Sequence, residues 1–269
     1  MNIVQNINNV KMKETILITG ASSGIGFEMA QLLAPNYRLI LLARNEHKLE
    51  KAAAFIRAIY PNASIQTQVC DLAVRSEIEN VYDSLKEQQI SVDMLVNNAG
   101  MGVYGNFTET NLDAEWQMIQ VNVSGLYLLT KLFSRDMATR KKGKILNVAS
   151  LLAFLPFPYF SVYSATKTFV LAFSETLAAE LAKDNVSVTT FCPGPVDTPF
   201  QTSEMLGTNA YKTNKPVSAE IVAKQAVHLL LNGTGKKIPG FQNWFISNLP
   251  RITPDFLMMK IKKHLASPN

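Results

Sequence analysis

Short, almost wholly apolar runs alternate with longer amphipathic segments along most of the chain. Six of the apolar runs have the length of buried strands: Thr15–Thr19, Arg38–Leu42, Ser64–Val69, Val92–Val96, Lys144–Val148 and Val186–Phe191. Five segments between them carry apolar residues at helical spacing: Gly24–Ala34, Glu46–Ile59, Arg75–Gln88, Asp113–Met137 and Ser164–Lys183. Strands that are apolar on both faces, each followed by a helix, are typical of a parallel sheet covered on both sides. The pattern predicts a doubly wound α/β fold of about seven strands, with ligands at the carboxyl ends of the strands.

The chain is expected to form a single domain, 1–269, because no repeat or linker divides it. Residues 195–216 are polar and lack a clear period, which predicts a mobile loop beside the substrate. A C-terminal extension, about 241–269, is apolar and basic. An amphipathic helix of this kind most often packs on its own core or on a sister subunit. The alternatives are that it covers the pocket or lies on a membrane.

Composition excludes several classes of protein. Hydrophobic residues make up 47% of the chain and charged residues 17%, which is unlike a disordered chain. The formal net charge is only +5 and the basic residues are scattered, so no nucleic-acid partner is expected. Cys70 and Cys192 end apolar runs far from any histidine, so both are expected to be buried thiols and no metal site is predicted. No apolar run approaches the ~20 residues that span a bilayer and no signal peptide is recognisable, so we expect a cytoplasmic protein without an integral membrane segment.

A glycine-rich turn joins the first predicted strand to the first helix. Its sequence is Thr19-Gly20-Ala21-Ser22-Ser23-Gly24-Ile25-Gly26. Gly20 allows a tight turn, Gly24 lets backbone N–H groups approach a pyrophosphate, and Gly26 permits close packing of helix on sheet. The helix N-terminus adds unpaired N–H donors and positive dipole density for phosphate. The turn and its position therefore predict a Rossmann-type dinucleotide site.

The residue that follows the second strand indicates which dinucleotide binds. A carboxylate there would bind the ribose 2′-hydroxyl of NAD, but the sequence has Arg44. The guanidinium can form charge-assisted hydrogen bonds to a 2′-phosphate, helped by the hydroxyl of Ser22 or Ser23. NADP(H) is therefore the predicted cofactor, and the alternative is a surface arginine without a ligand.

Tyr163 and Lys167 are four residues apart in a helical segment, so their side chains share one face. A tyrosine has an ordinary pKa of about 10 and is a poor acid–base group at neutral pH. A nearby ammonium stabilises the phenolate and a bound nicotinamide would add further positive charge, so the pKa of Tyr163 is expected to fall. Ser150, at the end of the preceding strand, could donate a hydrogen bond to the substrate oxygen. These three residues predict proton transfer at a carbonyl or hydroxyl group.

Two apolar segments flank the predicted site. Residues 151–160 contain four aromatic residues and two prolines, and Met101, Val103 and Tyr104 follow the fourth strand. Neither segment has a lysine or arginine that could bind a carboxylate or phosphate, which favours an apolar ketone, aldehyde or secondary alcohol as the substrate. The alternative is that these side chains only close the core.

Taken in order along the chain, these motifs resemble those of the short-chain dehydrogenase/reductase family over roughly residues 13–200. Seven elements match: Thr19 to Gly26, Asp71-Leu72, Asn97-Asn98-Ala99-Gly100, Asn122, Ser150, Tyr163 with Lys167, and Pro193-Gly194-Pro195-Val196-Asp197-Thr198. The resemblance implies an NADP-preferring oxidoreductase of the carbonyl reductase type. It also implies a homodimer or homotetramer that pairs through the helices at about 113–137 and 163–183.

The resemblance implies roles for the matched residues as well. Asp71 and Leu72 would hold the adenine, and Asn98, Ala99 and Gly100 would support the ribose and the central sheet. Lys167 would also bind the nicotinamide ribose, while Asn122 would anchor a water that links Lys167 to solvent. Pro193, Gly194 and Val196 would flank the nicotinamide, and Thr198 would bond its carboxamide.

The sequence departs from many members of this family after the last strand, where a segment with Phe241 to Phe245 and a further helix-length stretch replace the usual ending. This departure leaves the surface of the tetramer contact open. Two other functions remain alternatives: an NADP(H)-binding redox sensor without turnover, and an epimerase or dehydratase that uses a bound nucleotide. Relatives of the sensor type tend to lose the tyrosine or lysine, and both are present here.

Overall fold

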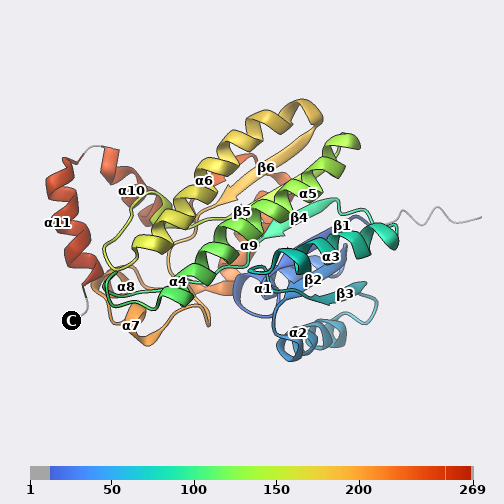
Figure 1. The fold of residues 1–269 in the computed structure, drawn as a ribbon, viewed down its shortest axis with the longest axis horizontal. Helices are drawn as coiled ribbons and strands as arrows, with labels where there is room; N and C mark the ends of the chain where they lie inside the picture. The colour runs from blue at the N-terminus through green and yellow to red at the C-terminus, as the bar shows by residue number, and fades with distance from the viewer. Residues whose placement is uncertain (1–12, 252, 268–269) are drawn as a thin grey trace, which may run out of the picture.

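The computed structural model describes residues 13–251 and 253–267. At its centre is a parallel sheet with the strand order β3-β2-β1-β4-β5-β6-β9 (Figure 1). The strands are β1 (Thr15–Thr19), β2 (Arg38–Ala43), β3 (Ile65–Val69), β4 (Met94–Asn97), β5 (Gly143–Val148), β6 (Val186–Phe191) and β9 (Gly235–Lys237). The predicted doubly wound sheet and its six assigned strands are therefore confirmed. The seventh strand, β9, is short and polar, which explains why apolar patterning did not locate it.

Alternate residues of each strand face helices on opposite sides of the sheet. In β1, Ile16 and Ile18 pack with the first core, while Leu17 packs with the second. The first core is covered by α1 (Gly24–Leu33), α2 (Glu46–Ile59) and α9 (Ala219–Asn232). The second is covered by α3 (Arg75–Glu87), α5 (Leu126–Thr139) and α6 (Ser161–Leu181). Burial on both faces explains why the central strands β1, β2 and β4 are nearly continuous apolar runs, whereas the edge strand β3 is only partly buried and more polar.

The chain reverses its direction of winding between β1 and β4, which are neighbours in the sheet although β2 and β3 separate them in sequence. Connections from these two strands leave toward opposite faces. The carboxyl ends of β1 and β4 therefore border an open crevice, which is where doubly wound sheets bind ligands. Both the glycine-rich turn and Asn98 follow strands at this position.

The helix expected over 113–137 is interrupted. It consists of α4 (Leu112–Ile119), a π-helical segment Gln120–Gly125, and α5. Gly125 faces the backbone of the segment after β3, where a Cβ atom would lie 2.6 Å from the carbonyl oxygen of Leu72. A wider helical turn at this contact is a local feature that apolar spacing does not reveal.

The segment 195–216, expected as a mobile loop, contains short regular elements. They are β7 (Val196–Asp197), α7 (Ser203–Leu206) and α8 (Asn209–Thr213), and β7 pairs with β8 (Val217–Ser218). Three short 3-10 turns lie elsewhere, at Leu151–Ala153, Ala182–Asp184 and Leu249–Arg251. The mobility of the segment 195–216 stays a prediction.

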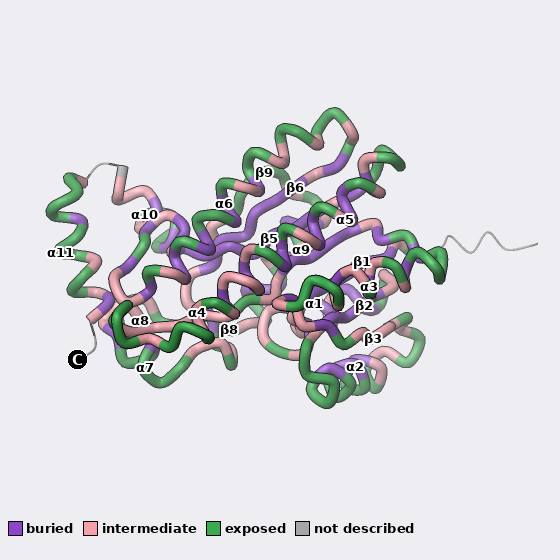
Figure 2. Tube along the Cα trace, viewed as in Figure 1, coloured by how far each residue is buried: buried purple, intermediate pink, exposed green. Residues whose placement is uncertain are grey.

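The C-terminal extension forms α10 (Phe241–Asn248) and α11 (Asp255–Ala266) at one end of the molecule (Figure 1). The inner side of α11 packs against the body of the protein: Met258 and Ala266 are buried, and the Tyr104 hydroxyl donates a hydrogen bond of 2.7 Å to the Ala266 carbonyl. Much of its outer side is exposed (Figure 2). Within the described residues, no helix is long and apolar enough to cross a membrane. Cys70 and Cys192 are buried free thiols, as expected.

Candidate active site

The glycine-rich turn forms a cradle that side chains would fill. Gly20 and Gly24 have φ angles of +66° and +57°, a region that favours glycine. A Cβ atom on Gly20 would lie 2.9 Å from Ala99 Cα, and one on Gly26 would lie 2.5 Å from the carbonyl oxygen of Gly20. The turn before α1 therefore packs directly against the turn after β4, and no space is left for a side chain between them. A backbone cradle at the N-terminus of a helix fits a dinucleotide pyrophosphate.

Thr19 joins this cradle to the turn after β4. Its hydroxyl accepts hydrogen bonds of 3.0 Å from the backbone N–H groups of both Asn98 and Ala99. The side-chain amide of Asn98 returns a hydrogen bond of 2.9 Å to the Thr19 carbonyl. The two turns are thus held together by reciprocal hydrogen bonds. In this structure, Asn98 supports the glycine-rich turn from the turn after β4.

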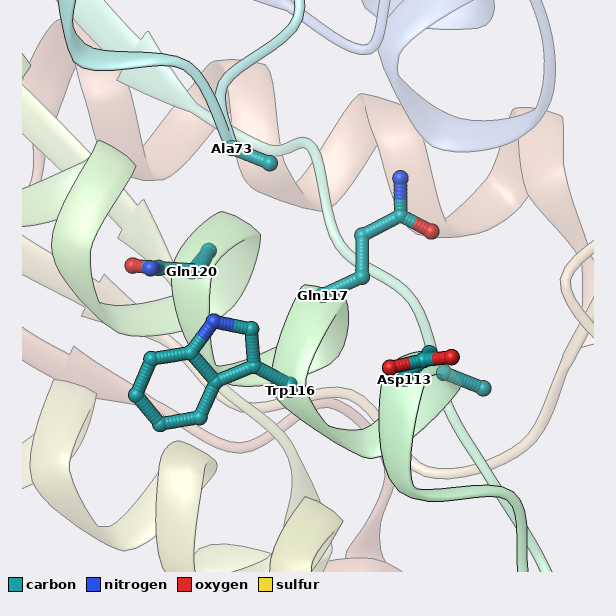
Figure 3. Close-up of a pocket in the computed structure, with 6 residues that line it drawn as sticks. Ala73, Asp113, Trp116, Gln117 and Gln120 are labelled. Carbon is teal, nitrogen blue, oxygen red and sulfur yellow. The ribbon is translucent and has the colours of Figure 1, made fainter.

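The three residues expected to meet the adenosine part of the cofactor, Arg44, Asp71 and Leu72, follow the adjoining strands β2 and β3. Arg44 is exposed directly after β2. The Asp71 carboxylate accepts a 2.9 Å hydrogen bond from the Ala73 N–H, which fixes its orientation, and Leu72 beside it is buried. A pocket of about 500 Å³ lies beside Ala73, facing α4. Figure 3 shows the side chains that line it. The other lining residues are Asp113, Ala114, Trp116, Gln117 and Gln120.

Tyr163, Lys167 and Ser150 come together at the carboxyl ends of β5 and β6. Tyr163 and Lys167 lie in the first turns of α6, and the Lys167 ammonium is 5.9 Å from the Tyr163 ring centre. All three side chains are buried. Ser150 follows β5, forms a hydrogen bond with the Tyr163 phenol, and accepts one of 3.1 Å from the Leu152 N–H. The structure therefore brings three of the four predicted catalytic residues into one place, and the fourth, Asn122, is described below.

Burial controls the ionisation of this group. It lowers the pKa of Lys167 to about 8, and the nearby Cys192 opposes this shift to a lesser extent. The ammonium donates a 2.9 Å hydrogen bond to the Val148 carbonyl, which fixes it below the site. Burial also raises the pKa of Tyr163, and the Ser150 hydrogen bond lowers it by less. In the chain without nucleotide, removal from water therefore raises the pKa of Tyr163. The expected fall, which also counted on the positive charge of a bound nicotinamide, stays a prediction for the complex.

Asn122 connects three segments from inside the π-helical turn. Its side chain accepts a 2.9 Å hydrogen bond from the Met101 N–H and donates one of 2.9 Å to the Met101 carbonyl. It donates a further bond of 3.1 Å to Thr166, whose hydroxyl bonds the Tyr163 carbonyl. A Cβ atom on Gly100 would lie 3.3 Å from both the Asn122 oxygen and the Lys167 nitrogen. Asn122 thus faces the same small space as Lys167.

The segment after β6 covers the cradle. Thr198 lies over the glycine-rich turn, because a Cβ atom on Gly24 would be 3.0 Å from its methyl group. Pro193 and Val196 are buried, and the Pro193 carbonyl accepts a 2.8 Å hydrogen bond from Leu151 N–H. Gly194 packs directly against the Asn243 amide of α10. The residues expected at the nicotinamide therefore lie between the cradle and the Tyr163 group.

An apolar cluster encloses the remaining side of Tyr163. Phe200 packs on the phenol, with ring centres 5.6 Å apart, and also touches Gly102 after β4. The buried members of this cluster are Met118, Leu155, Phe157, Phe160, Tyr163, Met205, Met258 and Ala266. The two apolar segments predicted beside the site, 151–160 and the residues after β4, thus pack in one cluster. The 195–216 segment and the C-terminal helices complete this cluster.

Comparison with known proteins identifies the family to which this chain belongs. A model of the short chain dehydrogenase family matches residues 14–208. The chain belongs to the short-chain dehydrogenase family. This dehydrogenase is accordingly an NAD(P)-dependent oxidoreductase. Its sequence is 32% identical over 215 residues to an uncharacterized oxidoreductase of Staphylococcus saprophyticus, covering 80% of this chain and 89% of the relative.

Other curated relatives have comparable identity. An NADP-dependent 3-hydroxy acid dehydrogenase of Schizosaccharomyces pombe is 32% identical over 221 residues, covering 78% of this chain and 84% of the relative. A dehydrogenase/reductase of Anopheles gambiae is 32% identical over 201 residues, covering 73% of this chain, which spans only 63% of that relative's length.

Two solved structures resemble this dehydrogenase over most of its length. The bulky-bulky ketone specific alcohol dehydrogenase from Comamonas testosteroni has a TM-score of 0.75 at 26% identity, covering 88% of this chain and 92% of that chain. A variant of actinorhodin polyketide ketoreductase, solved with NADPH, has a TM-score of 0.75 at 27% identity, covering 84% and 95%.

Several residues that shape the site were not predicted from the sequence. Thr166 and Asn243 act through hydrogen bonds to distant segments, and Phe200 reaches Tyr163 from the polar 195–216 segment. Thr166 could have been suspected, because it lies one helical turn after Tyr163 and next to Lys167. No sequence signal pairs Asn243 or Phe200 with the site.

Proposed function

We propose that this dehydrogenase reduces a ketone or aldehyde with NADPH, reversibly, and that Tyr163 supplies the proton. When bound, the reduced nicotinamide supplies the hydride that adds to the carbonyl carbon. The raised pKa keeps the Tyr163 phenol protonated at neutral pH, so it can give its proton to the carbonyl oxygen as the C=O bond becomes single. The Ser150 hydroxyl, beside the phenol, would donate a hydrogen bond to the same oxygen.

Lys167 would stabilise the phenolate left after proton transfer. With a pKa of about 8, it is mostly positively charged at neutral pH although it is buried. Its hydrogen bond to the Val148 carbonyl holds the charge in place before the reaction. The observation that carries the proposal is this buried group of Tyr163, Lys167 and Ser150, next to a backbone cradle of the right shape for a dinucleotide.

The proposed preference for NADP(H) rests on Arg44. The guanidinium is exposed directly after β2, at the strand end nearest the cradle, and it has no ion-pair partner among the described residues. An unpaired guanidinium favours a 2′-phosphate over a hydroxyl. The NADP-dependent fission yeast relative and the ketoreductase solved with NADPH support this preference.

The proposed substrate is apolar. The cluster around Tyr163 consists of aliphatic, aromatic and methionine side chains, and residues 151–160, which contribute to it, contain no lysine or arginine. An anionic oxo-acid would lose its hydration there without gaining a positively charged partner. The ketone specificity named for the Comamonas relative supports an apolar carbonyl compound here.

The test is a screen of NADPH oxidation with apolar ketones, aldehydes and small oxo-acids, with Tyr163→Phe as the control. We expect turnover of the apolar carbonyls, and a fall in kcat of roughly 100-fold or more in Tyr163→Phe with unchanged NADPH affinity. We expect Arg44→Asp to lower kcat/KM with NADPH by about 10-fold to 100-fold and to favour NADH.

Three results would count against the proposal. Faster reduction of charged oxo-acids would refute the apolar substrate, and an unchanged coenzyme preference in Arg44→Asp would refute the role of Arg44. Tight NADPH binding with no turnover, and no effect of Tyr163→Phe, would favour a redox sensor instead.

A further inference from the structure

The net charge of the chain is concentrated in its C-terminal part. Residues 236–269 contain six lysines or arginines and a single acidic residue, Asp255, so their formal charge equals the +5 of the whole chain. The preceding 235 residues are therefore neutral overall. Three of the basic residues, Lys260, Lys262 and Lys263, lie in α11 and form no ion pair with any described residue.

The same region exposes an unusual number of large apolar side chains. In α10, Phe241 is 80% exposed, and Trp244 and Phe245 follow it on the outer face. In α11, Phe256 is 71% exposed. Three other apolar residues of α11 are also exposed: Leu257, Met259 and Ile261. Single exposed apolar residues are common, but a group on two adjoining segments marks an interaction surface.

The inner faces of α10 and α11 are already satisfied within the molecule. Met258 and Ala266 of α11 are buried in the cluster that contains Tyr163, and Ile246 of α10 packs against it. Asn243 accepts a hydrogen bond from Asn214 and donates one to the Pro239 carbonyl. The exposed aromatic residues are therefore not displaced core residues.

We propose that the outer faces of α10 and α11 dock this protein on the surface of an anionic phospholipid bilayer. Lysines beside exposed Phe, Trp and Leu side chains suit a surface that offers negative headgroups above an apolar layer. Trp244 is suited to the headgroup level, because its ring is apolar and its indole N–H is polar. Binding is peripheral, since no described helix can span a membrane.

A second copy of this chain fits the surface less well. A symmetric pair would bring together two copies of α11, each with three lysines and one acidic residue, Asp255. Repulsion between like charges would oppose the contact, whereas anionic headgroups neutralise them. The proposal concerns only the outward faces, so it does not depend on the identity of the substrate.

The experiment uses Trp244 as the reporter. The chain has two tryptophans, so the full-length variant W116F leaves Trp244 alone. We expect its emission to shift to the blue, and the protein to sediment, with vesicles of phosphatidylglycerol and phosphatidylcholine at equal amounts. Binding should weaken steeply as salt screens the headgroups. K260Q/K262Q/K263Q in this background should lower the partition constant by about 100-fold, since each lysine contributes roughly 5-fold.

The matched control removes three exposed lysines far from the C-terminal helices. K48Q/K51Q/K183Q loses the same charge but should keep vesicle binding within about 3-fold, because Lys48 and Lys51 lie in α2 and Lys183 follows α6 (Figure 1). Circular dichroism checks that each variant folds, and the salt titration of W116F gives a second measurement that needs no lysine variant.

Four results would overturn the proposal. They are no binding to anionic vesicles, equal binding to vesicles of phosphatidylcholine alone, binding unaffected by salt, and an equal loss of binding in both triple variants. Equally, if sedimentation equilibrium shows an oligomer that Phe241→Ser and Trp244→Ser dissociate, a second copy occupies this surface and the lipid proposal is wrong.

Discussion

Replacing the buried lysine of the candidate site with methionine should change how stability depends on pH. Lys167 is only 4% exposed, and its pKa falls from 10.5 to about 8 on folding. Between these two values the unfolded chain binds a proton that the native chain does not bind. The stability of the unaltered protein should therefore rise with pH across this window. Below pH 8 both states are protonated, and the cost of burying the charge is fully present.

The size of the effect follows from the shift. One pKa unit corresponds to about 1.4 kcal/mol, so the 10.5-to-8 shift of Lys167 makes the charge cost about 3 kcal/mol. Methionine has a similar length and no charge, so Lys167→Met escapes this cost but leaves the Val148 carbonyl without its donor. The lost hydrogen bond gives an offset that does not depend on pH. The stability of the variant relative to the parent should thus fall by about 3 kcal/mol between pH 8 and 10.5.

The assay is urea unfolding followed by circular dichroism, at half-unit steps from pH 7 to 10.5, for both proteins without nucleotide. Lys131→Met is the matched control, since Lys131 is exposed on α5 and should give a difference that is flat with pH. A constant difference between Lys167→Met and the parent, or one that grows with pH in favour of the variant, would refute the argument that Lys167 is buried with its charge.

Two further predictions concern packing around the site. Gly26→Ala should destabilise the fold by about 1–3 kcal/mol and weaken NADPH binding, because the new Cβ would lie 2.5 Å from the Gly20 carbonyl oxygen. Urea unfolding measures the change in stability. The control Gly207→Ala, whose new Cβ would lie 3.5 Å from its nearest neighbour, should change stability little. Asn243→Ala should cost about 1–3 kcal/mol and speed proteolysis within 195–216, because it removes the bonds to Asn214 and Pro239; unaltered cleavage there would contradict the role of Asn243.

The sequence alone predicted those strands, turns and site residues that are marked by a pattern of neighbouring residues. Buried parallel strands such as Leu39 to Leu42 are apolar on both faces, and the glycine turn has a fixed position between strand and helix. Tyr163 and Lys167 share a helical face, so their proximity needed no tertiary information. The arrangement of the sheet then brought these local features together.

What could not be predicted depends on contacts between distant segments. The π-helical turn that carries Asn122 lies against the backbone of Leu72 at Gly125, and β9 owes its place to pairing with β6 and not to apolar patterning. The sequence gives the charge near Tyr163 but not the loss of water around the phenol, which raises the pKa of Tyr163 in the chain without nucleotide. The position of α11 against Tyr104 is likewise a tertiary outcome.

The walls around Tyr163 also impose an order on biosynthesis. They come from five stretches of chain, and the last of them ends at Ala266, whose carbonyl accepts a hydrogen bond from Tyr104. Strands β1 and β4, with the turns that follow them, lie within the first 100 residues. Helix α9, which covers the first core together with α1, and the C-terminal helices leave the ribosome after them. The chamber around Tyr163 can therefore close only after Ala266 has been synthesised, and the proton donor stays open to water until then.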